Sequence, residues 1–410
     1  MSDGKMNKEE RIKKEKAGLD VFNDILRYAR TGFDSIDPDD MVRFKWYGVY
    51  QQRPKNGHFM MRVKVPGGRL TTPQLRTIAD LTTKYARGIG DITTRQTIQL
   101  HWMRIENFPD VFARLDAAGL TTAGACGDIA RNLTSSPTAG FDPQELVDTR
   151  PVVDALQKFF YLNKDFGDMP RKYKIAVEGS PVQSTLPQIN DAALVAHRRP
   201  SDGVVGYHFL AGGGLSLQPH FGQMLDIFVP ADQIDRIVDV QRAISEIYRD
   251  ADQLRVKRTR ARLKYLMADW GVEKFTAEVR AKLDWTPDPA APGFAYSDET
   301  FRDHVGINAQ KQPGLHWIGL CILSGRITDA QMRAAADVAD KYGGGEVRLT
   351  NVQNMLIPHI PTENLKPAQA ALRAAGFEWD VPAIRRGAIA CTGIEFCNLA
   401  ITETKIKIKD

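Results

Sequence analysis

Two cysteines stand close together near the end of this 410-residue chain, Cys391 and Cys397 in the segment ACTGIEFC. Thiolates at such a spacing bind soft metal ions or iron–sulfur clusters. The chain has two further cysteines, Cys126 and Cys321, both distant from this pair in the sequence. Because a cluster needs four thiolates, the pattern alone fits either two cluster ligands or two structural cysteines.

Cationic side chains form a second group that could do chemistry. They are Arg62 and Lys64 in MMRVKV, Arg95 in TTRQT, Arg131 in DIARN, and Lys172 and Lys174 in PRKYK. In an alternating strand Arg62 and Lys64 share one face, and so do Lys172 and Lys174. Gathered guanidinium and ammonium groups bind oxyanions or carboxylates, although a solvated strand face would show the same pattern.

Two other stretches invite a functional interpretation. The basic run RVKRTRARLK at 255–264 could bind nucleic acid, but it also fits the solvated face of a long helix over 238–270. The segment AGGGLS at 211–216 lacks the spacing of a phosphate-binding loop, so we expect a tight turn close to a ligand.

The elements that must position these residues can be predicted from composition and pattern. A chain of 410 residues predicts two or three domains, because single cores stop growing at about 250–300 residues. Hydrophobic residues make up 43% and charged residues 26%, which excludes wholesale disorder, and the net charge of +5 suits an anionic ligand. No window reaches the roughly 18 apolar residues of a membrane span, so we expect a cytoplasmic protein in a reducing compartment.

Local patterns predict the first elements of the chain. Residues 5–30 predict a surface helix that serves as an arm or cap. From residue 57 the sequence predicts a strand ending in Pro-Gly-Gly, a helix that begins near residue 72, and a second strand over GDITTRQTIQLHWM. The Pro- and Ala-rich stretch at 286–293 predicts a domain boundary.

This strand–helix–strand unit occurs twice. Residues 68–102 align without a gap to 325–359, which lie 257 positions later, and the identical positions include Gly, Arg, Gln, Asp and Lys in register. Two unrelated amphipathic helices would share apolar positions only, so we infer an internal duplication with a pseudo-twofold arrangement and a ligand between the halves.

The second copy lacks the cations of the first. Gly319 stands at the position of Arg62 and Val352 at that of Arg95, and Cys321 at that of Lys64 predicts a core strand residue. Cations present in only one half of a symmetric frame indicate an asymmetric anion site.

Taken together, the motifs resemble those of one family. FMMRVKVPGG, DITTRQTIQLHW, GDIARN, MPRKYKIAV, AGGGLS and ACTGIEFCNLAITETK occur in the same order as similar motifs of the siroheme- and 4Fe-4S-containing nitrite and sulfite reductases of the ferredoxin-dependent assimilatory type. The resemblance covers nearly the whole chain from about Trp46 to Lys405. It implies an α+β fold, with duplicated ferredoxin-like half units, an α/β siroheme-binding domain, pseudo-twofold symmetry and an incomplete second α/β domain.

The resemblance also implies an enzyme. Its reaction would be the six-electron reduction of nitrite to ammonia, or of sulfite to sulfide, at a siroheme coupled to a 4Fe-4S cluster. The catalytic cations around the oxyanion would be Arg62, Arg131, Lys172 and Lys174. The residues that bind siroheme would be Arg95, Gln99, His101 and Arg131.

In this family Cys391 and Cys397 match the first pair of cluster cysteines. A second pair, spaced C-x3-C, would follow, and no such pair occurs in this chain. We therefore expect a reductase that is truncated at its carboxyl end, with two of the four cluster ligands absent. The alternative is a truncated, non-catalytic relative that binds siroheme or another anion.

The resemblance divides on the substrate. Lys174 resembles the sulfite reductases, because nitrite reductases of the ferredoxin type usually carry Asn there, whereas CTGIEFC followed by ETK resembles the nitrite reductases. We favour nitrite slightly. A ferredoxin is the expected electron donor, because the chain contains no flavin or nicotinamide module, and we expect a monomer that does not bind nucleic acid or membranes.

The implied domains run in this order: a helical arm at 1–50, a first ferredoxin-like unit at 51–120, a siroheme-binding α/β domain at 121–295, a second ferredoxin-like unit at 305–378, and the start of the incomplete second domain at 384–410.

Overall fold

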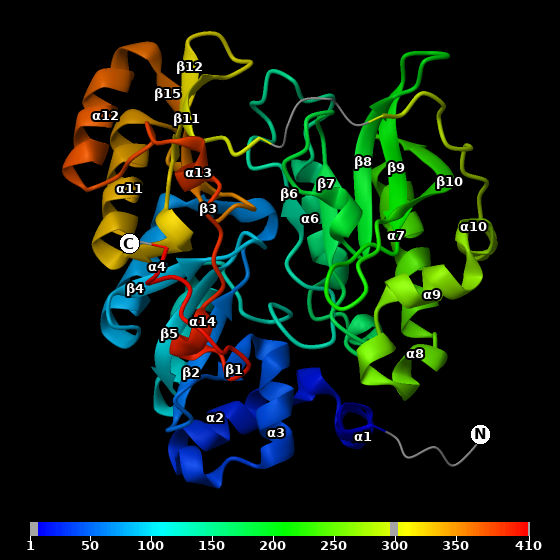
Figure 1. The fold of residues 1–410 in the computed structure, drawn as a ribbon, viewed down its shortest axis with the longest axis horizontal. Helices are drawn as coiled ribbons and strands as arrows, with labels where there is room; N and C mark the ends of the chain where they lie inside the picture. Colours follow the sequence, from blue (N-terminus) through cyan, green and yellow to red (C-terminus); the bar gives the residue numbers. More distant parts are fainter. Residues whose placement is uncertain (1–6, 296–301, 409–410) are drawn as a thin grey trace. The chain divides into compact units, whose positions relative to one another are not determined.

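The computed structural model describes residues 7–295 and 302–408 (Figure 1). It divides into two compact units. The first unit comprises the chain up to Asp20, Cys126–Gly140 and Gln144–Arg302. The second comprises Val21–Ala125, Phe141–Pro143 and the chain from Asp303 onward. The chain is mixed α+β, as the sequence predicts.

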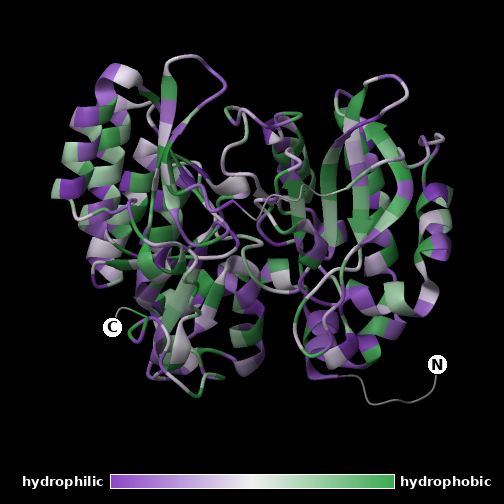
Figure 2. Cartoon of the chain, turned by 45° about the horizontal axis from the view of Figure 1, so that its top comes forward, coloured by the Kyte–Doolittle hydropathy of each residue, from purple (hydrophilic) through white to green (hydrophobic). Residues whose placement is uncertain are grey.

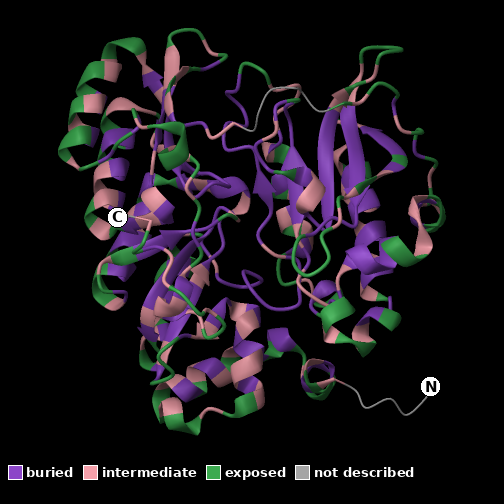
Figure 3. Ribbon diagram, in the orientation of Figure 1, coloured by how far each residue is buried: buried purple, intermediate pink, exposed green. Residues whose placement is uncertain are grey.

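The first unit is built on one five-stranded sheet of order β10-β9-β8-β7-β6. β6, β7 and β8 pair in parallel, whereas β8, β9 and β10 pair antiparallel. The strands β7, β8 and β9 are largely apolar and buried (Figures 2 and 3), as expected for the middle of a covered sheet, whereas Gln223 and Asp226 of β10 are exposed. Their bounds are β6 Thr134–Ser135, β7 Ile175–Glu178, β8 Ala192–Arg198, β9 Val205–Ala211 and β10 Gln223–Pro230.

Helices supply the rest of the first unit's core. Apolar residues of the strands and helices form one continuous buried cluster, which includes Leu156, Leu194 and Ile244. The main helices are α6 Arg150–Phe160, α7 Ile234–Arg249, α9 Leu263–Trp270 and α10 Val272–Ala281.

The second unit contains the two repeats, each with its own five-stranded sheet. The sheet orders are β1-β2-β5-β4-β13 and β11-β12-β15-β14-β3. Each repeat thus gives one short strand to the sheet of the other, since β13 pairs with β4 and β3 pairs with β14. The bounds are β1 Val49–Gln51, β2 His58–Val63, β3 Arg69–Thr71, β4 Ile89–Ile92, β5 Ile98–Arg104, β11 Gly306–Ala309, β12 Leu315–Leu320, β13 Arg326–Thr328, β14 Glu346–Leu349 and β15 Met355–Pro361.

Six principal helices complete the second unit, and the paired helices α4 and α11 follow the exchanged strands. Both begin with a capping box, Thr71 with Gln74 and Thr328 with Gln331, which satisfies the free amides of the first turn. The bounds are α2 Phe22–Thr31, α3 Pro38–Arg43, α4 Thr72–Tyr85, α5 Phe108–Ala117, α11 Asp329–Tyr342 and α12 Leu365–Ala374.

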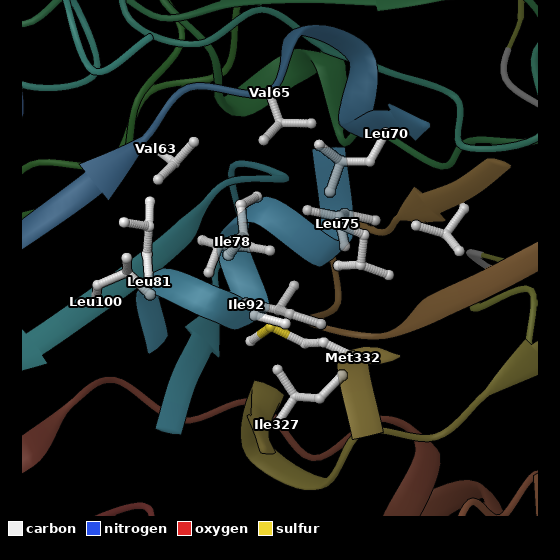
Figure 4. Packing of buried hydrophobic residues seen from close by; sticks show 14 of the residues in the cluster. Val63, Val65, Leu70, Leu75, Ile78, Leu81, Ile92, Leu100, Ile327 and Met332 are labelled. Atoms are coloured by element: carbon white, nitrogen blue, oxygen red, sulfur yellow. The ribbon is translucent and has the colours of Figure 1, made fainter. Parts of the chain in front are cut away.

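Contacts between the repeats are reciprocal. Gln96 Nε2 donates to the carbonyl oxygen of Leu349 at 2.9 Å, and Gln353 Nε2 donates to that of Ile92 at 3.0 Å. These two interactions are equivalent under the 257-residue offset. The core is shared in the same way (Figure 4), because Leu75 and Ile92 of one copy lie in one cluster with Ile327 and Met332 of the other. The sequence-predicted duplication is therefore a structural one.

The segment GDITTRQTIQLHWM is not one strand, as predicted, but two. β4 ends at Ile92, and a turn at 93–97 leads into β5. In this turn Thr93 N donates to Thr97 O at 2.9 Å, and Gln96 takes a left-handed conformation with φ 54°. Apolar residues on both sides of a polar turn produce the same pattern as one long strand.

Two predicted helices are also interrupted. The helix expected over 5–30 is α1 Lys8–Glu15 followed, after an extended Lys16, by a short 3-10 turn and α2. The helix expected over 238–270 consists of α7, the short α8 Gln253–Val256, a 3-10 turn and α9. Ion pairs of the connecting arginines, described below, stabilise the irregular backbone there.

The 286–293 stretch belongs to the first unit. Phe228 N donates to Asp288 O at 2.9 Å, and the division between the units follows Arg302. The stretch at 286–293 thus packs along β10, and the division between the units comes a few residues after the predicted boundary.

Candidate functional site

Arg131, Lys172 and Lys174 lie in the first unit, beside the start of the sheet. Lys172 and Lys174 precede β7 rather than lying within a strand, but Tyr173 between them is buried and its N–H donates to Ile129 O at 3.1 Å. Arg131 N donates back to Tyr173 O at 2.8 Å. This backbone pairing holds the arginine and the two lysines on adjacent segments.

The electrostatics of Lys172 suit a site for an anion. Burial, together with Arg131, Arg262 and Arg171, lowers the pKa of Lys172 to about 8, and Asp191 offsets only part of this effect. An ammonium group surrounded by guanidinium groups is destabilised until an anion binds beside it.

Asp191 links the segment that carries Lys172 and Lys174 to Arg262. Its carboxylate is fully buried and accepts from Arg262 Nε at 2.7 Å and Nη2 at 2.8 Å. The same carboxylate accepts the backbone N–H of Lys174 at 2.8 Å. Asp191 directly precedes β8, so this bond fixes the position of the Lys172–Lys174 segment relative to the sheet.

The basic run at 255–264 is occupied by acidic partners. Arg258 pairs with Asp128, Arg255 with Glu10 at 2.9 Å, and Arg262 with Asp191. Arginines that are held by buried carboxylates are poorly placed to bind phosphate, so Arg255, Arg258 and Arg262 serve as internal support.

Arg62, Arg95, Gln99 and His101 lie in the second unit. Arg62 is on β2 and donates from Nη1 to Thr97 Oγ1 at 3.0 Å, while its buried Nε has no hydrogen-bond partner among the described residues. Gln99 is on β5, opposite Arg62 in the antiparallel register. Arg95 lies in the 93–97 turn and is held by its N–H, which donates to Thr93 Oγ1 at 3.2 Å.

Lys64, two residues beyond Arg62, is buried, and burial lowers its pKa to about 8. Neither Arg62 nor Lys64 forms an ion pair within the described part of the chain. At the position equivalent to Arg62, Gly319 has no room for a side chain, because a Cβ there would lie 1.9 Å from His304 O. The backbone of His304 and Val305, just before β11, lies against this position in the second copy and leaves no space there for an arginine side chain.

His101 is buried beneath the C-terminal segment. Its ring stacks on Phe396 with centroids 3.8 Å apart and an interplanar angle of 11°. Its Nε2 lies 3.3 Å from Asp91 Oδ2, and its Nδ1 lies 3.4 Å from Gln52 Oε1. Burial lowers the pKa of His101, although Asp91 acts in the opposite direction. The side chain of His101 is thus engaged within its own unit.

Cys391 and Cys397 flank the short helix α14, Gly393–Phe396, in the second unit. Cys391 is exposed and Cys397 half-buried, with Sγ accepting from Leu399 N at 3.4 Å. Cys321 follows β12 and is half-buried, and its Sγ lies 3.8 Å from Arg385 O. In residues 7–295 and 302–408, no three His, Cys, Asp or Glu side chains are grouped to hold a metal ion. Cys391 and Cys397 can supply two thiolates of a cluster, and the described residues do not complete a set of four.

Sequence reasoning missed two acidic residues, Asp191 and Asp91. Each is buried and organises the cations around it, but an isolated aspartate in a sequence carries no such signal. Asp91 could have been noticed from the repeat alignment, because the second copy has Arg348 at its position.

Fold and residues together define a class of protein: a duplicated ferredoxin-like unit with a cysteine turn, and an α/β unit with clustered cations. Comparison with family models agrees. The model for the nitrite and sulphite reductase 4Fe-4S domain matches residues 126–286. The model for the nitrite/sulfite reductase ferredoxin-like half domain matches 50–118 and 308–375. The chain therefore belongs to the nitrite and sulfite reductase family, whose members are oxidoreductases.

Individual relatives support this assignment. The chain is 37% identical to ferredoxin–nitrite reductase of Synechococcus elongatus, over 98% of this chain and 78% of the relative. It is 35% identical to sulfite reductase [ferredoxin] 2 of Mycolicibacterium paratuberculosis, over 98% and 74%. The solved structure of the Mycobacterium tuberculosis NirA protein matches with a TM-score of 0.92 and 36% identity, over 98% of this chain and 76% of that one.

The described residues contain no helix with the length and apolar character needed to span a membrane.

Proposed function

We propose that the protein catalyses the siroheme-dependent six-electron reduction of nitrite to ammonia, with sulfite as the competing substrate. The observation that carries this proposal is a set of cations without acidic partners. Arg62 and Lys64 of the second unit, and Arg131 and Lys172 of the first, form no ion pair within the described residues, whereas the arginines of the basic run at 255–264 are all paired. Unpaired, partly buried cations in a family of oxyanion reductases are suited to bind the substrate and the carboxylates of the macrocycle.

The chemical types of these side chains suit siroheme, which carries many carboxylates. Arg95, Gln99 and Arg131 would bind its carboxylates, and the buried Lys64 offers a further charge for them. His101 was expected in the same role, but here its ring is covered by Phe396 and faces Asp91. When bound, siroheme supplies an iron that takes the substrate and passes electrons to it.

The chain's own cations have two tasks in this proposal. Arg62, Arg131, Lys172 and Lys174 hold the oxyanion, because ammonium and guanidinium groups stabilise its negative charge. Lys172, with its pKa of about 8, can also release a proton near neutral pH as an oxygen leaves the substrate.

Cys391 and Cys397 are proposed as two of the cluster ligands. The described residues do not complete the cluster, so no step of the reaction is derived through it. Ferredoxin is proposed as electron donor because the relatives of both substrate types are named for it.

The test is to produce the protein together with the enzymes of siroheme synthesis and to record its absorption spectrum. Nitrite and sulfite consumption with chemically reduced ferredoxin is then measured. Siroheme absorption with ammonia formation supports the proposal. Siroheme absorption without reduction of either anion favours the non-catalytic, siroheme-binding alternative, and absence of siroheme absorption contradicts both.

Replacing Lys174 by asparagine is expected to shift the preference from sulfite toward nitrite. The side chain loses a positive charge, and sulfite carries more negative charge than nitrite at neutral pH. The ratio of kcat/KM for nitrite to that for sulfite should rise by roughly tenfold, as for the loss of one hydrogen bond to a charged group. An unchanged ratio would reject Lys174 as a discriminator.

Anion affinity is expected to fall as the pH rises through about 8. The pKa of Lys172 lies near that value, so the free site loses its ammonium charge above it, and binding must then take up a proton. The affinity for nitrite should fall by up to about tenfold per pH unit between roughly pH 8 and pH 9.5. Spectral titration of the siroheme protein measures this, and Lys172→Arg should flatten the profile because the guanidinium stays charged.

A further inference from the structure

A buried ionic cluster in the second unit joins the ferredoxin-like sheet to the C-terminal segment. Its centre is Asp91 on β4, whose side chain is 1% exposed. Arg326 on β13 donates to this carboxylate from Nε at 3.1 Å and from Nη2 at 3.3 Å. Lys405 Nζ lies 3.5 Å from Asp91 Oδ1 and also donates to Ser324 O. One buried carboxylate thus holds a cation from the second repeat and one from the C-terminal segment.

The same arginine, Arg326, also contacts the segment from Cys391 to Cys397, called the cysteine turn. Arg326 Nη1 donates to Glu395 Oε2 at 2.8 Å, and Glu395 lies between Cys391 and Cys397 in α14. On the other side of the turn, the ring of Phe396 stacks on that of His101. The carbonyl oxygen of Phe396 accepts from Arg53 N at 3.0 Å. The turn is therefore held by ion pairs on one flank and by an aromatic stack on the other.

Further bonds hold the flanking residues. Gln353 and Ala390 exchange two hydrogen bonds, from Gln353 Nε2 at 3.1 Å and from Ala390 N at 2.9 Å. Asn398 Nδ2 donates to Gln51 O at 3.2 Å, and Thr404 Oγ1 donates to Cys391 O at 2.6 Å. In Figure 1 this red segment, with α13 (Ala383–Arg386) and α14, runs alongside the strands of the second unit.

The duplication shows that this arrangement belongs to one repeat. In the exchanged-strand register Arg326 pairs with Asp91, whereas the equivalent pair in the other sheet is Arg69 with Arg348. Two arginines cannot form the ion pair that Asp91 makes, so only the first repeat carries an anion at this place. The C-terminal segment docks where that anion is.

We propose that Asp91, Arg326 and Lys405 form an ionic clamp that positions the Cys391–Cys397 turn before any metal binds. Asp91 is a positioning residue: it acts on the thiols through Arg326 and Glu395 and through Lys405. The clamp keeps α14 on the sheet, so that the two thiols are presented from a fixed backbone rather than from a free tail. The inference depends on the proposed function only in taking these two cysteines as ligands.

The test measures thiol protection in the purified protein without cofactors. Cys397 is half-buried, so its alkylation by iodoacetamide under native conditions reports opening of the turn. Asp91→Asn and Lys405→Met should each speed alkylation of Cys397 by roughly 10–100-fold, the ratio that corresponds to losing a hydrogen bond to a charged group. Peptide mass spectrometry locates the modified cysteine, and hydrogen exchange of the amides of Ala390 and Cys397 should accelerate in parallel.

Three further variants separate positioning from general destabilisation. Glu395→Gln changes a partly exposed side chain, so unfolding is not expected, and it should give a smaller increase in the same direction. Lys405→Arg should retain protection because the charge remains. Glu346→Gln removes an acid from the equivalent strand β14, where it pairs with Arg348 at 2.8 Å, and should leave Cys397 unchanged.

The proposal is overturned if Asp91→Asn and Glu395→Gln leave Cys397 protection unchanged. It is equally overturned if Glu346→Gln exposes Cys397 as much as they do. The buried Cys126 of the first unit serves as an internal reference for unfolding of the whole chain. Because no siroheme is needed, failure of this test is distinct from failure of the proposed reaction.

Discussion

Lys172→Met is expected to lower kcat/KM for nitrite by about 10²–10³-fold, the range observed when one preorganised donor to a developing charge is removed. Lys172 lies beside Arg131 in the first unit, and burial together with the surrounding cations lowers its pKa to about 8. Methionine has nearly the same length and can fill the same space, so the loss would be electrostatic. Steady-state kinetics with reduced ferredoxin on the siroheme-loaded protein measure the effect.

A second lysine provides the control for this variant. Lys158 lies exposed on α6 of the same unit, and Lys158→Met should change kcat/KM by less than about twofold, as surface substitutions usually do. Lys172→Arg should keep a substantial part of the activity, because it retains the positive charge. It should not restore full activity, because a planar guanidinium differs in shape from a compact ammonium group. Full activity of Lys172→Met would remove Lys172 from the catalytic set.

Asp191→Asn is expected to destabilise the first unit by about 3–5 kcal/mol, because removing one partner of a buried ion pair leaves the other charge uncompensated. The Asp191 carboxylate is fully buried, and its partner Arg262 is 11% exposed. The bidentate bonds to Arg262 and the bond to Lys174 N would all lose the negative acceptor. Hydrogen-exchange protection of the β8 amides in increasing urea measures the free energy of unfolding of this unit.

Asp202→Asn is the matched control. Asp202 also pairs with an arginine, Arg199, at 2.7 Å, but its side chain is 43% exposed. Water screens such a pair, so its loss should cost less than about 1 kcal/mol. If both variants lose the same stability, burial of the Asp191 pair is not what stabilises this unit.

Asp191→Asn also has an expected effect on function. Lys174 is attached to Asp191 through its backbone, so a weaker attachment lets the Lys172–Lys174 segment move relative to β7. At temperatures where the variant remains folded, we expect KM for the anion to rise more than kcat falls.

The duplication shows what can be predicted from a sequence. Two copies at a constant offset preserve Gly, Gln and Asp positions, and these identities survive because each has a local task, such as the capping boxes at Thr71 and Thr328. The cations were recognisable for a similar reason, since their absence from the second copy is visible in the alignment. The glycine at 319 has a steric reason that only the structure shows, because the backbone of His304 lies against it.

Other features depended on partners distant in the sequence. The exchange of β3 and β13 leaves no local trace, because a three-residue strand has the same pattern whichever sheet it joins. The break in the helix expected over 238–270 lies where Arg255, Arg258 and Arg262 meet acids from other segments. Neither helical periodicity nor charge counting contains those contacts.

The sequence by itself determined the repeat, the family resemblance and the identity of the two thiols and the clustered cations, because these are properties of residue type and spacing. The tertiary structure decided which of these groups are paired and which are not. It placed Asp191 under Lys174, engaged His101 with Asp91 and Phe396, and attached the cysteine turn to the first repeat through Arg326. Charge pairing depends on distances of a few ångströms between segments that fold together, and that information exists only once the chain has folded.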